Sequence, residues 1–146
     1  MDVHTKRNLE LTEKMNDKSK KGTLLWVLDK TYTSMGGRLL RRWINDPLLD
    51  VNEINKRLDA VKNLKDDFIL RGDITECLKK VYDIERLIGK IVYGSANARD
   101  LVALKLSLMQ LPELKQLLLT IDDELISKLT ENLDEMKTDV LLGYAE

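Results

Sequence analysis

Few residues in this chain of 146 residues are of a type that does chemistry. His4 is the only histidine and Cys77 the only cysteine. The chain therefore lacks the residues for the usual histidine and cysteine zinc sites, and a nucleophile has no second histidine to choose as its base. Cys77 lies between Ile74 and Val81 in an amphipathic pattern, which favours a buried structural thiol in a reducing compartment. We predict no catalytic and no metal-ligating residue.

Two pairs of neighbouring carboxylates are the next candidates for catalysis, and a glycine-lysine pair is a candidate for phosphate binding. Asp66-Asp67 and Asp122-Asp123 fall at expected helix boundaries, where a carboxylate interacts favourably with a helix N-terminus. This position favours helix capping over paired-carboxylate catalysis. Gly89-Lys90 resembles the end of a P-loop, but Ile84 stands where the first glycine belongs and Ile91 where Ser or Thr belongs. The chain has no Walker A motif, and we expect it to bind no cofactor.

Three arginines, Arg38, Arg41 and Arg42, share one face of a helix predicted to begin after Thr33 or Ser34. Positive charge supplies most of the sequence-independent affinity of proteins for DNA, so this face is a candidate for DNA contact. The face carries no interleaved aromatic residue and no Asn or Gln to read bases, which favours a solvated surface or salt bridges to another domain. Both interpretations stay open.

The opposite face of that helix is apolar and contains two glycines, Gly36 and Gly37. A glycine inside a helix destabilises it by roughly 0.5–1 kcal/mol relative to alanine, so two on one packed face predict that another element lies close to the backbone. The helix is expected to end before Pro47, because a residue preceding proline avoids the α conformation. The predicted packing residues are Gly36, Gly37, Leu40, Trp43 and Pro47.

Composition and periodicity predict an all-α fold. Apolar residues make up 43% of the chain, charged residues 34% and aromatic residues 5%, with two prolines, a profile typical of a soluble, mostly helical protein. Residues 2–12 fit either a helical turn or a strand, and residues 14–22 fit an exposed connection. We expect an irregular helical core bundle of about six to eight helices. Apolar spacing predicts helices over residues 23–30, 33–46, 50–64, 68–82 and 83–94.

From Asn97 to Val140, leucines and other apolar residues recur at steps of three or four, as in a helix-packing seam. Pro112 interrupts the seam, but the residue before it, Leu111, is a poor N-cap. We therefore predict one kinked helix rather than two separate ones. The bundle is expected to end in a long C-terminal helical arm.

Charge and hydropathy narrow the possible partners. Lys and Arg number 24 against 25 Asp and Glu, so the whole chain does not indicate an anionic partner. The first 47 residues hold 10 basic and 6 acidic side chains and are the only basic region. No apolar run approaches the ~18–20 residues of a membrane span, and the first residues contain no signal-peptide core. We expect a cytoplasmic protein with no membrane association.

Several motifs in register resemble one known family. The first group is Thr5-x-x-Asn8-Leu9-Glu10, then Leu28-Asp29-x-Thr31-x-Thr33-x-Met35-Gly36-x-Arg38-x-Leu40-x-Arg42-Trp43, then Pro47-Leu48. The second group is Asp83-Ile84-Glu85-Arg86-Leu87, Ala98-Arg99-Asp100-Leu101 and Leu111-Pro112-Glu113-Leu114. Each motif alone is weak. Together, from residue 5 to residue 114, they resemble the core domain of the bacterial MutS family of DNA mismatch-repair ATPases.

The resemblance implies a role inside a longer parent protein. Residues 1–121 would form the helical core domain, domain III, and residues 122–146 the start of a lever helix leading toward a clamp. The core would connect the ATPase, the clamp and the mismatch-reading domain, and would transmit conformational change among them. ATP and Mg would bind the parent, and the fragment by itself would be no enzyme.

The implied partners are those domains of the parent chain, mismatched duplex DNA bound through the parent, and a MutL-type repair partner. The implied location is cytoplasmic and nucleoid-associated. Two other interpretations stay open: an independent helical module that binds a partner helix along residues 101–121, and a sequence-independent DNA binder that uses residues 38–42.

Overall fold

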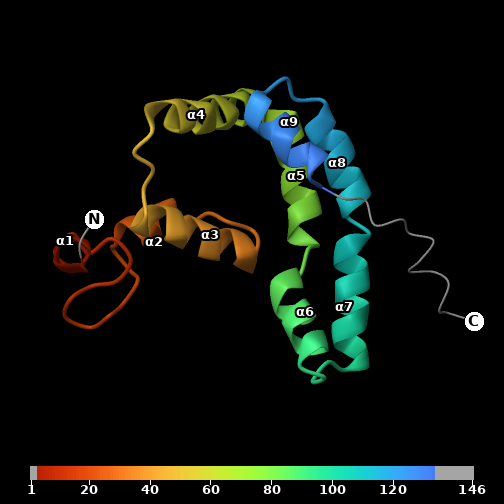
Figure 1. Cartoon of the computed structure of the whole chain (residues 1–146), viewed down its shortest axis with the longest axis horizontal. Helices are drawn as coiled ribbons and strands as arrows, with labels where there is room; N and C mark the ends of the chain where they lie inside the picture. Colours follow the sequence, from red (N-terminus) through yellow and green to blue (C-terminus); the bar gives the residue numbers. More distant parts are fainter. Residues whose placement is uncertain (1–2, 134–146) are drawn as a thin grey trace, which may run out of the picture. The chain divides into compact units, whose positions relative to one another are not determined.

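The computed structural model describes residues 3–133, and every regular element in that range is an α-helix (Figure 1). The prediction of an all-α fold is confirmed. The chain divides into two compact units between Val51 and Asn52. The boundary that we expect at residue 121, between core and lever, stays a prediction. Among residues 3–133, no helix has the length and the apolar character needed to cross a membrane.

The first unit has a small core around α2. Its helices are α1 (Val3–Asn8), α2 (Leu24–Leu28) and α3 (Ser34–Asn45). The undecided element of residues 2–12 is thus helical at α1. The backbone N–H of Leu25 donates to the carbonyl of Leu11 at 2.9 Å, which fastens the long connection to α2. Leu25 is only 1% exposed and forms the centre of this unit.

Threonine caps define the starts of α2 and α3. The Thr23 hydroxyl accepts from the backbone N–H of Trp26 at 3.2 Å. Between Thr33 and Ser34 the structure selects Thr33, whose Oγ1 accepts from Gly36 N–H at 3.0 Å. Such caps satisfy backbone donors that the first helical turn leaves unpaired. The helix α3 ends at Asn45, shortly before Pro47, which confirms the predicted stop.

The second unit contains a long helical hairpin. Its helices are α4 (Val51–Asp66), α5 (Phe68–Lys79), α6 (Ile84–Val92), α7 (Ala98–Leu108), α8 (Leu111–Leu119) and α9 (Glu124–Glu131). Figure 1 shows α5 and α6 leading away from α4, and α7 and α8 returning beside them. The helix α5 packs against α8, α6 against α7, and α9 against α8. Asp67 and Asp123 cap α5 and α9, so the capping interpretation of both acid pairs is confirmed.

Local signals fix the tip of the hairpin. Gly94 has a φ of +66°, a left-handed conformation that favours glycine. Asn97 and Asp100 then form a reciprocal capping box at the start of α7. Lys90 Nζ lies 2.7 Å from Asp100 Oδ1 and joins α6 to α7. The hydrogen bond from Lys90 is the main cause that lowers the pKa of Asp100 below its usual value.

The prediction of one kinked helix through Pro112 is wrong. The helix α7 ends at Leu108, and α8 begins at Leu111 after a two-residue interruption. Pro112 lies in the first turn of α8, where its missing N–H would have no intrahelical acceptor in any case. The N-cap residue is Gln110, which keeps a helical backbone conformation and makes no side-chain cap. A poor side-chain cap therefore did not prevent a new helix. The end of the predicted seam, at Met136 and Val140, lies outside the described residues.

A buried serine accepts a hydrogen bond from the backbone between α5 and α6. Ser107 is 0% exposed, accepts from the backbone N–H of Tyr82 at 2.9 Å, and donates to the carbonyl of Ala103 at 2.8 Å. Nearby, Cys77 is 2% exposed, which confirms its predicted burial. Burial is also the main cause that raises the pKa of its thiol. Both small polar side chains thus serve packing inside the hairpin.

Replacement of Ser107 by alanine should destabilise the chain by about 0.5–1.5 kcal/mol, because the Tyr82 N–H would lose the hydroxyl that accepts its hydrogen bond. Urea unfolding followed by circular dichroism measures this. Ser127, which is exposed on α9, supplies the matched Ser→Ala control, with an expected effect within about 0.5 kcal/mol. Equal effects at both positions would contradict the assignment.

Candidate functional site

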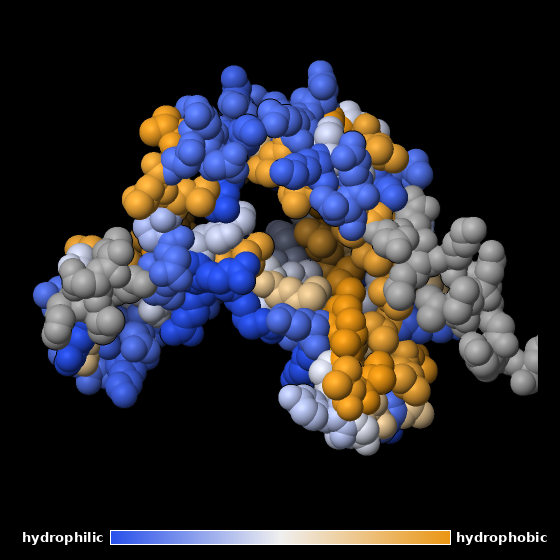
Figure 2. Space-filling model, viewed as in Figure 1, coloured by the Kyte–Doolittle hydropathy of each residue, from blue (hydrophilic) through white to orange (hydrophobic). Residues whose placement is uncertain are grey.

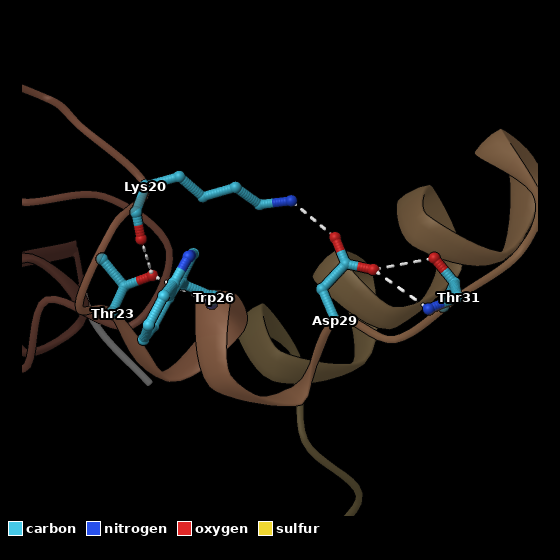
Figure 3. A network of polar contacts seen from close by, with 5 residues as sticks. All are labelled: Lys20, Thr23, Trp26, Asp29 and Thr31. Carbon is cyan, nitrogen blue, oxygen red and sulfur yellow. Dashed lines mark hydrogen bonds and ion pairs between the residues drawn. The ribbon is translucent and has the colours of Figure 1, made fainter.

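A charged network fixes the turn between α2 and α3 (Figure 3). Asp29 Oδ2 lies 2.5 Å from Lys20 Nζ, and Asp29 Oδ1 accepts from the Thr31 hydroxyl at 2.7 Å. The Thr31 N–H also donates to Oδ1, at 3.4 Å. Figure 3 shows Lys20, from before α2, and Thr31, from after it, both directed at the one carboxylate. Asp29, at the end of α2, therefore links the segment before α2 to the turn that follows it.

This environment keeps Asp29 charged. The hydrogen bond from Lys20, followed by that from Thr31, lowers the pKa of Asp29 from 3.8 to about 2. The Asp29 side chain is 19% exposed while that of Lys20 is 51% exposed, so water screens the ion pair and its contribution is modest. The main effect of the Asp29 carboxylate is to fix the position of Thr31 relative to the end of α2.

The turn held in this way lies directly on the two glycines of α3. A Cβ atom on Gly36 would stand 3.0 Å from Thr33 Oγ1 and 3.5 Å from Thr31 Cβ. One on Gly37 would stand 3.2 Å from Thr31 Oγ1. We define residues 29–37 as the glycine seat. The segment that lies close to the glycines is the turn directly before α3, whereas the sequence predicted another element of the fold.

The other predicted packing residues lie nearer the surface. No residue of α3 is fully buried, and Trp43 is 42% exposed. Leu40 is half-buried and Pro47 is exposed. Their packing role stays a prediction. The three candidate contact residues on the same helix are all exposed, namely Arg38, Arg41 and Arg42.

The described residues of this site hold the backbone in place. Among residues 3–133, no group of three His, Cys, Asp or Glu side chains is placed to hold a metal ion. His4 belongs to α1, and its side chain lies outside the described part of the chain. The glycine seat places the start of α3 against a charged turn.

Lys20 and Asp29 are not recognisable from the sequence as parts of a site. Lys20 was placed in an exposed connection, and Asp29 entered only as one position of a motif. The sequence does contain a local signal for the contact between Asp29 and Thr31. An Asp side chain commonly accepts a hydrogen bond from the backbone N–H two residues later and so forms a tight turn. The pairing with Lys20 crosses a whole helix and has no local signature.

Comparison with known proteins places the chain in a family. The profile described as MutS domain III matches residues 4–143. The chain belongs to the MutS domain III family. The resemblance seen in the motifs is thereby confirmed.

Three similar relatives share one name, DNA mismatch repair protein MutS. The chain is 58% identical over 134 residues to that of Ruminiclostridium cellulolyticum and 53% over 137 residues to that of Alkaliphilus oremlandii. It is 54% identical over 135 residues to that of Brevibacillus brevis. These alignments cover 92–94% of this chain but 15–16% of the relatives. The chain thus spans about 15% of the length of its relatives.

Alanine at the four helical glycines tests the close contact. Gly72→Ala and Gly89→Ala should stabilise the chain by about 0.5–1 kcal/mol, since a Cβ there meets nothing within 4 Å. At Gly36 and Gly37 the same methyl group meets Thr33 and Thr31, so the gain should be lost or reversed. Urea unfolding followed by circular dichroism measures all four. An equal gain at every position would show that the turn yields freely.

The Asp29 ion pair predicts a pH dependence. Because the folded pKa of about 2 lies below the unfolded value of about 3.9, the pair stabilises the fold above about pH 4 and is lost as pH falls toward 2. The stability difference between wild type and Asp29→Asn should shrink over that range. Both tryptophans lie in the first unit, so their fluorescence follows its unfolding. Lys20→Met should make the dependence shallower, and identical pH curves for wild type and Asp29→Asn would contradict the assignment.

Proposed function

We propose that this chain is the core segment of a longer DNA mismatch-repair protein, in which it connects other domains and transmits conformational change among them. The family match over residues 4–143 carries this proposal. The names of the relatives supply mismatch repair, and the short span of the chain relative to them supports a role inside a larger protein.

The surface of the second unit supports a connecting role. Figure 2 shows hydrophobic residues gathered over α6 and α7. An open hollow of about 510 Å³ is lined there by Tyr82, Val102 and Leu106, among others. Large apolar surfaces on a soluble protein usually mark contacts with other protein. We expect other domains of the parent to cover this face.

Transmission requires an element with two alternative packings, because coupling between distant sites needs states that each site favours differently. The glycine seat is the candidate, since a Cβ atom on Gly36 or Gly37 would already press on a threonine hydroxyl, at 3.0 or 3.2 Å, and closely packed contacts transmit strain. In the parent, ATP and Mg would bind the ATPase, and mismatched DNA and a MutL-type protein would bind elsewhere. The exposed arginines of α3 would contact another domain or DNA. A cytoplasmic, nucleoid-associated location follows from this role.

The second candidate is a stand-alone helical module that binds a partner helix along residues 101–121. The exposure of Leu101, Val102 and Leu106 on α7 favours it. Hydrodynamic measurement separates the two: a module of this kind gives a discrete monomer or dimer, whereas a core removed from its neighbours self-associates through its apolar face.

Gly36→Val in the longer protein tests the joint. Valine adds two methyl groups to a Cβ that already meets Thr33 at 3.0 Å, so one of the two packings should be lost. ATP-driven release of mismatched DNA should slow by about fivefold or more, while ATP hydrolysis without DNA persists. Gly89→Val, at an open helical position, is the control. Normal release by a correctly folded Gly36→Val protein would contradict the role of the seat.

A further inference from the structure

The corner where α4 gives way to α5 presents two large apolar side chains to solvent. Phe68 is 75% exposed and its neighbour Ile69 is 76% exposed. Phe68 is the only phenylalanine in the chain. Neither residue belongs to the glycine seat.

Arg71 holds the Phe68 ring in place. Its guanidinium carbon lies 5.3 Å from the ring centroid, within the range of a cation–π contact. The same guanidinium donates through Nη1 to the carbonyl of Lys65 at 2.8 Å and to that of Leu64 at 3.4 Å, at the end of α4. An aromatic side chain that is already ordered loses little entropy on binding, which is typical of interface anchors.

Carboxylates surround this anchor. A hollow of about 600 Å³ beside Phe68 and Ile69 is lined also by Asn63, Asp66, Asp67, Ile121 and Asp122. Its lining therefore includes three aspartates and neither Lys nor Arg. Asp67 caps α5 through the Leu70 N–H at 2.9 Å. Among residues 3–133, Asp66 and Asp122 have no ion pair or side-chain hydrogen bond. We call this surface the Phe68 corner.

We propose that the Phe68 corner binds a segment of the same longer polypeptide, outside residues 1–146, that places a lysine or arginine beside an apolar side chain. This inference rests on the proposed function. A cation would pair with Asp66 and Asp122, and the apolar side chain would cover Phe68 and Ile69.

The choice of occupant follows from charge and tether. Three aspartates in the lining select a basic segment over an acidic or neutral one. The chain spans about 15% of its relatives' length, so most of the parent would be covalently attached to this surface. A tethered segment is present at an effective concentration that separate proteins rarely reach.

Photo-crosslinking in the full-length protein tests this directly. Ile69→p-benzoylphenylalanine leaves Phe68 and the carboxylates in place, and it should crosslink within the chain to a segment beyond residues 1–146. Mass spectrometry should find Lys or Arg next to the crosslinked site. Asp66→Asn combined with Asp122→Asn should lower the yield about fivefold or more, and added salt should lower it too.

The matched control places the same photoreactive residue at Leu129, which is 60% exposed on α9 and does not line the hollow. Its crosslinks should not respond to the Asp66 and Asp122 changes. Crosslinking from position 69 to another protein, to a second copy, or to nothing would overturn the proposal, as would a yield that ignores both aspartates. If one of these outcomes occurs while ATP-driven DNA release in the same preparation is normal, the docking proposal is wrong and the proposed function stands.

Discussion

The approach of a charged turn to the backbone of α3 is the constraint on which the first unit depends. The Lys20, Asp29 and Thr31 network fixes the turn, and Gly36 and Gly37 admit it because neither carries a side chain. Each half needs the other. The network helps to hold the turn in place, and a larger residue at Gly36 or Gly37 would press on it. Under the proposed function, a joint of this kind would pass displacement on to α3 rather than absorb it.

Across residues 3–133, few apolar residues are buried, and many polar contacts join the elements. Only Leu25, Ala60, Cys77, Leu87 and Ile126 are buried apolar residues in the described part. Polar links join elements elsewhere: Lys56 Nζ lies 2.9 Å from Glu124 Oε1, and Asn63 Nδ2 lies 3.0 Å from Asp123 Oδ2, between α4 and the start of α9. Exposed pairs of this sort stabilise little. This architecture agrees with the proposal that other domains of a longer protein cover the exposed apolar faces.

Local signals made much of the fold predictable, and long-range pairings did not. Thr23 and Asn97 announce helix starts because a cap involves residues only three apart. The break before Pro112 has no sequence signal, because Met109 and Gln110 keep helical backbone angles although α7 ends at Leu108 and α8 begins at Leu111. The contact of Lys20 with Asp29 depends on how α2 is oriented, and the meeting of Asp66 with Asp122 depends on the fold of α4, α8 and α9. No sequence period encodes either.

A double-mutant cycle between Thr31 and Gly37 tests the glycine seat most directly. The four proteins are wild type, Thr31→Ala, Gly37→Ala and the double variant, with unfolding of the first unit followed by the fluorescence of Trp26 and Trp43. Removal of Thr31 Oγ1, 3.2 Å from the Cβ that Gly37→Ala introduces, should relieve the clash. The account predicts a favourable coupling of about 0.5–3 kcal/mol. Strictly additive effects would mean that the turn does not bear on α3, and the account would be wrong.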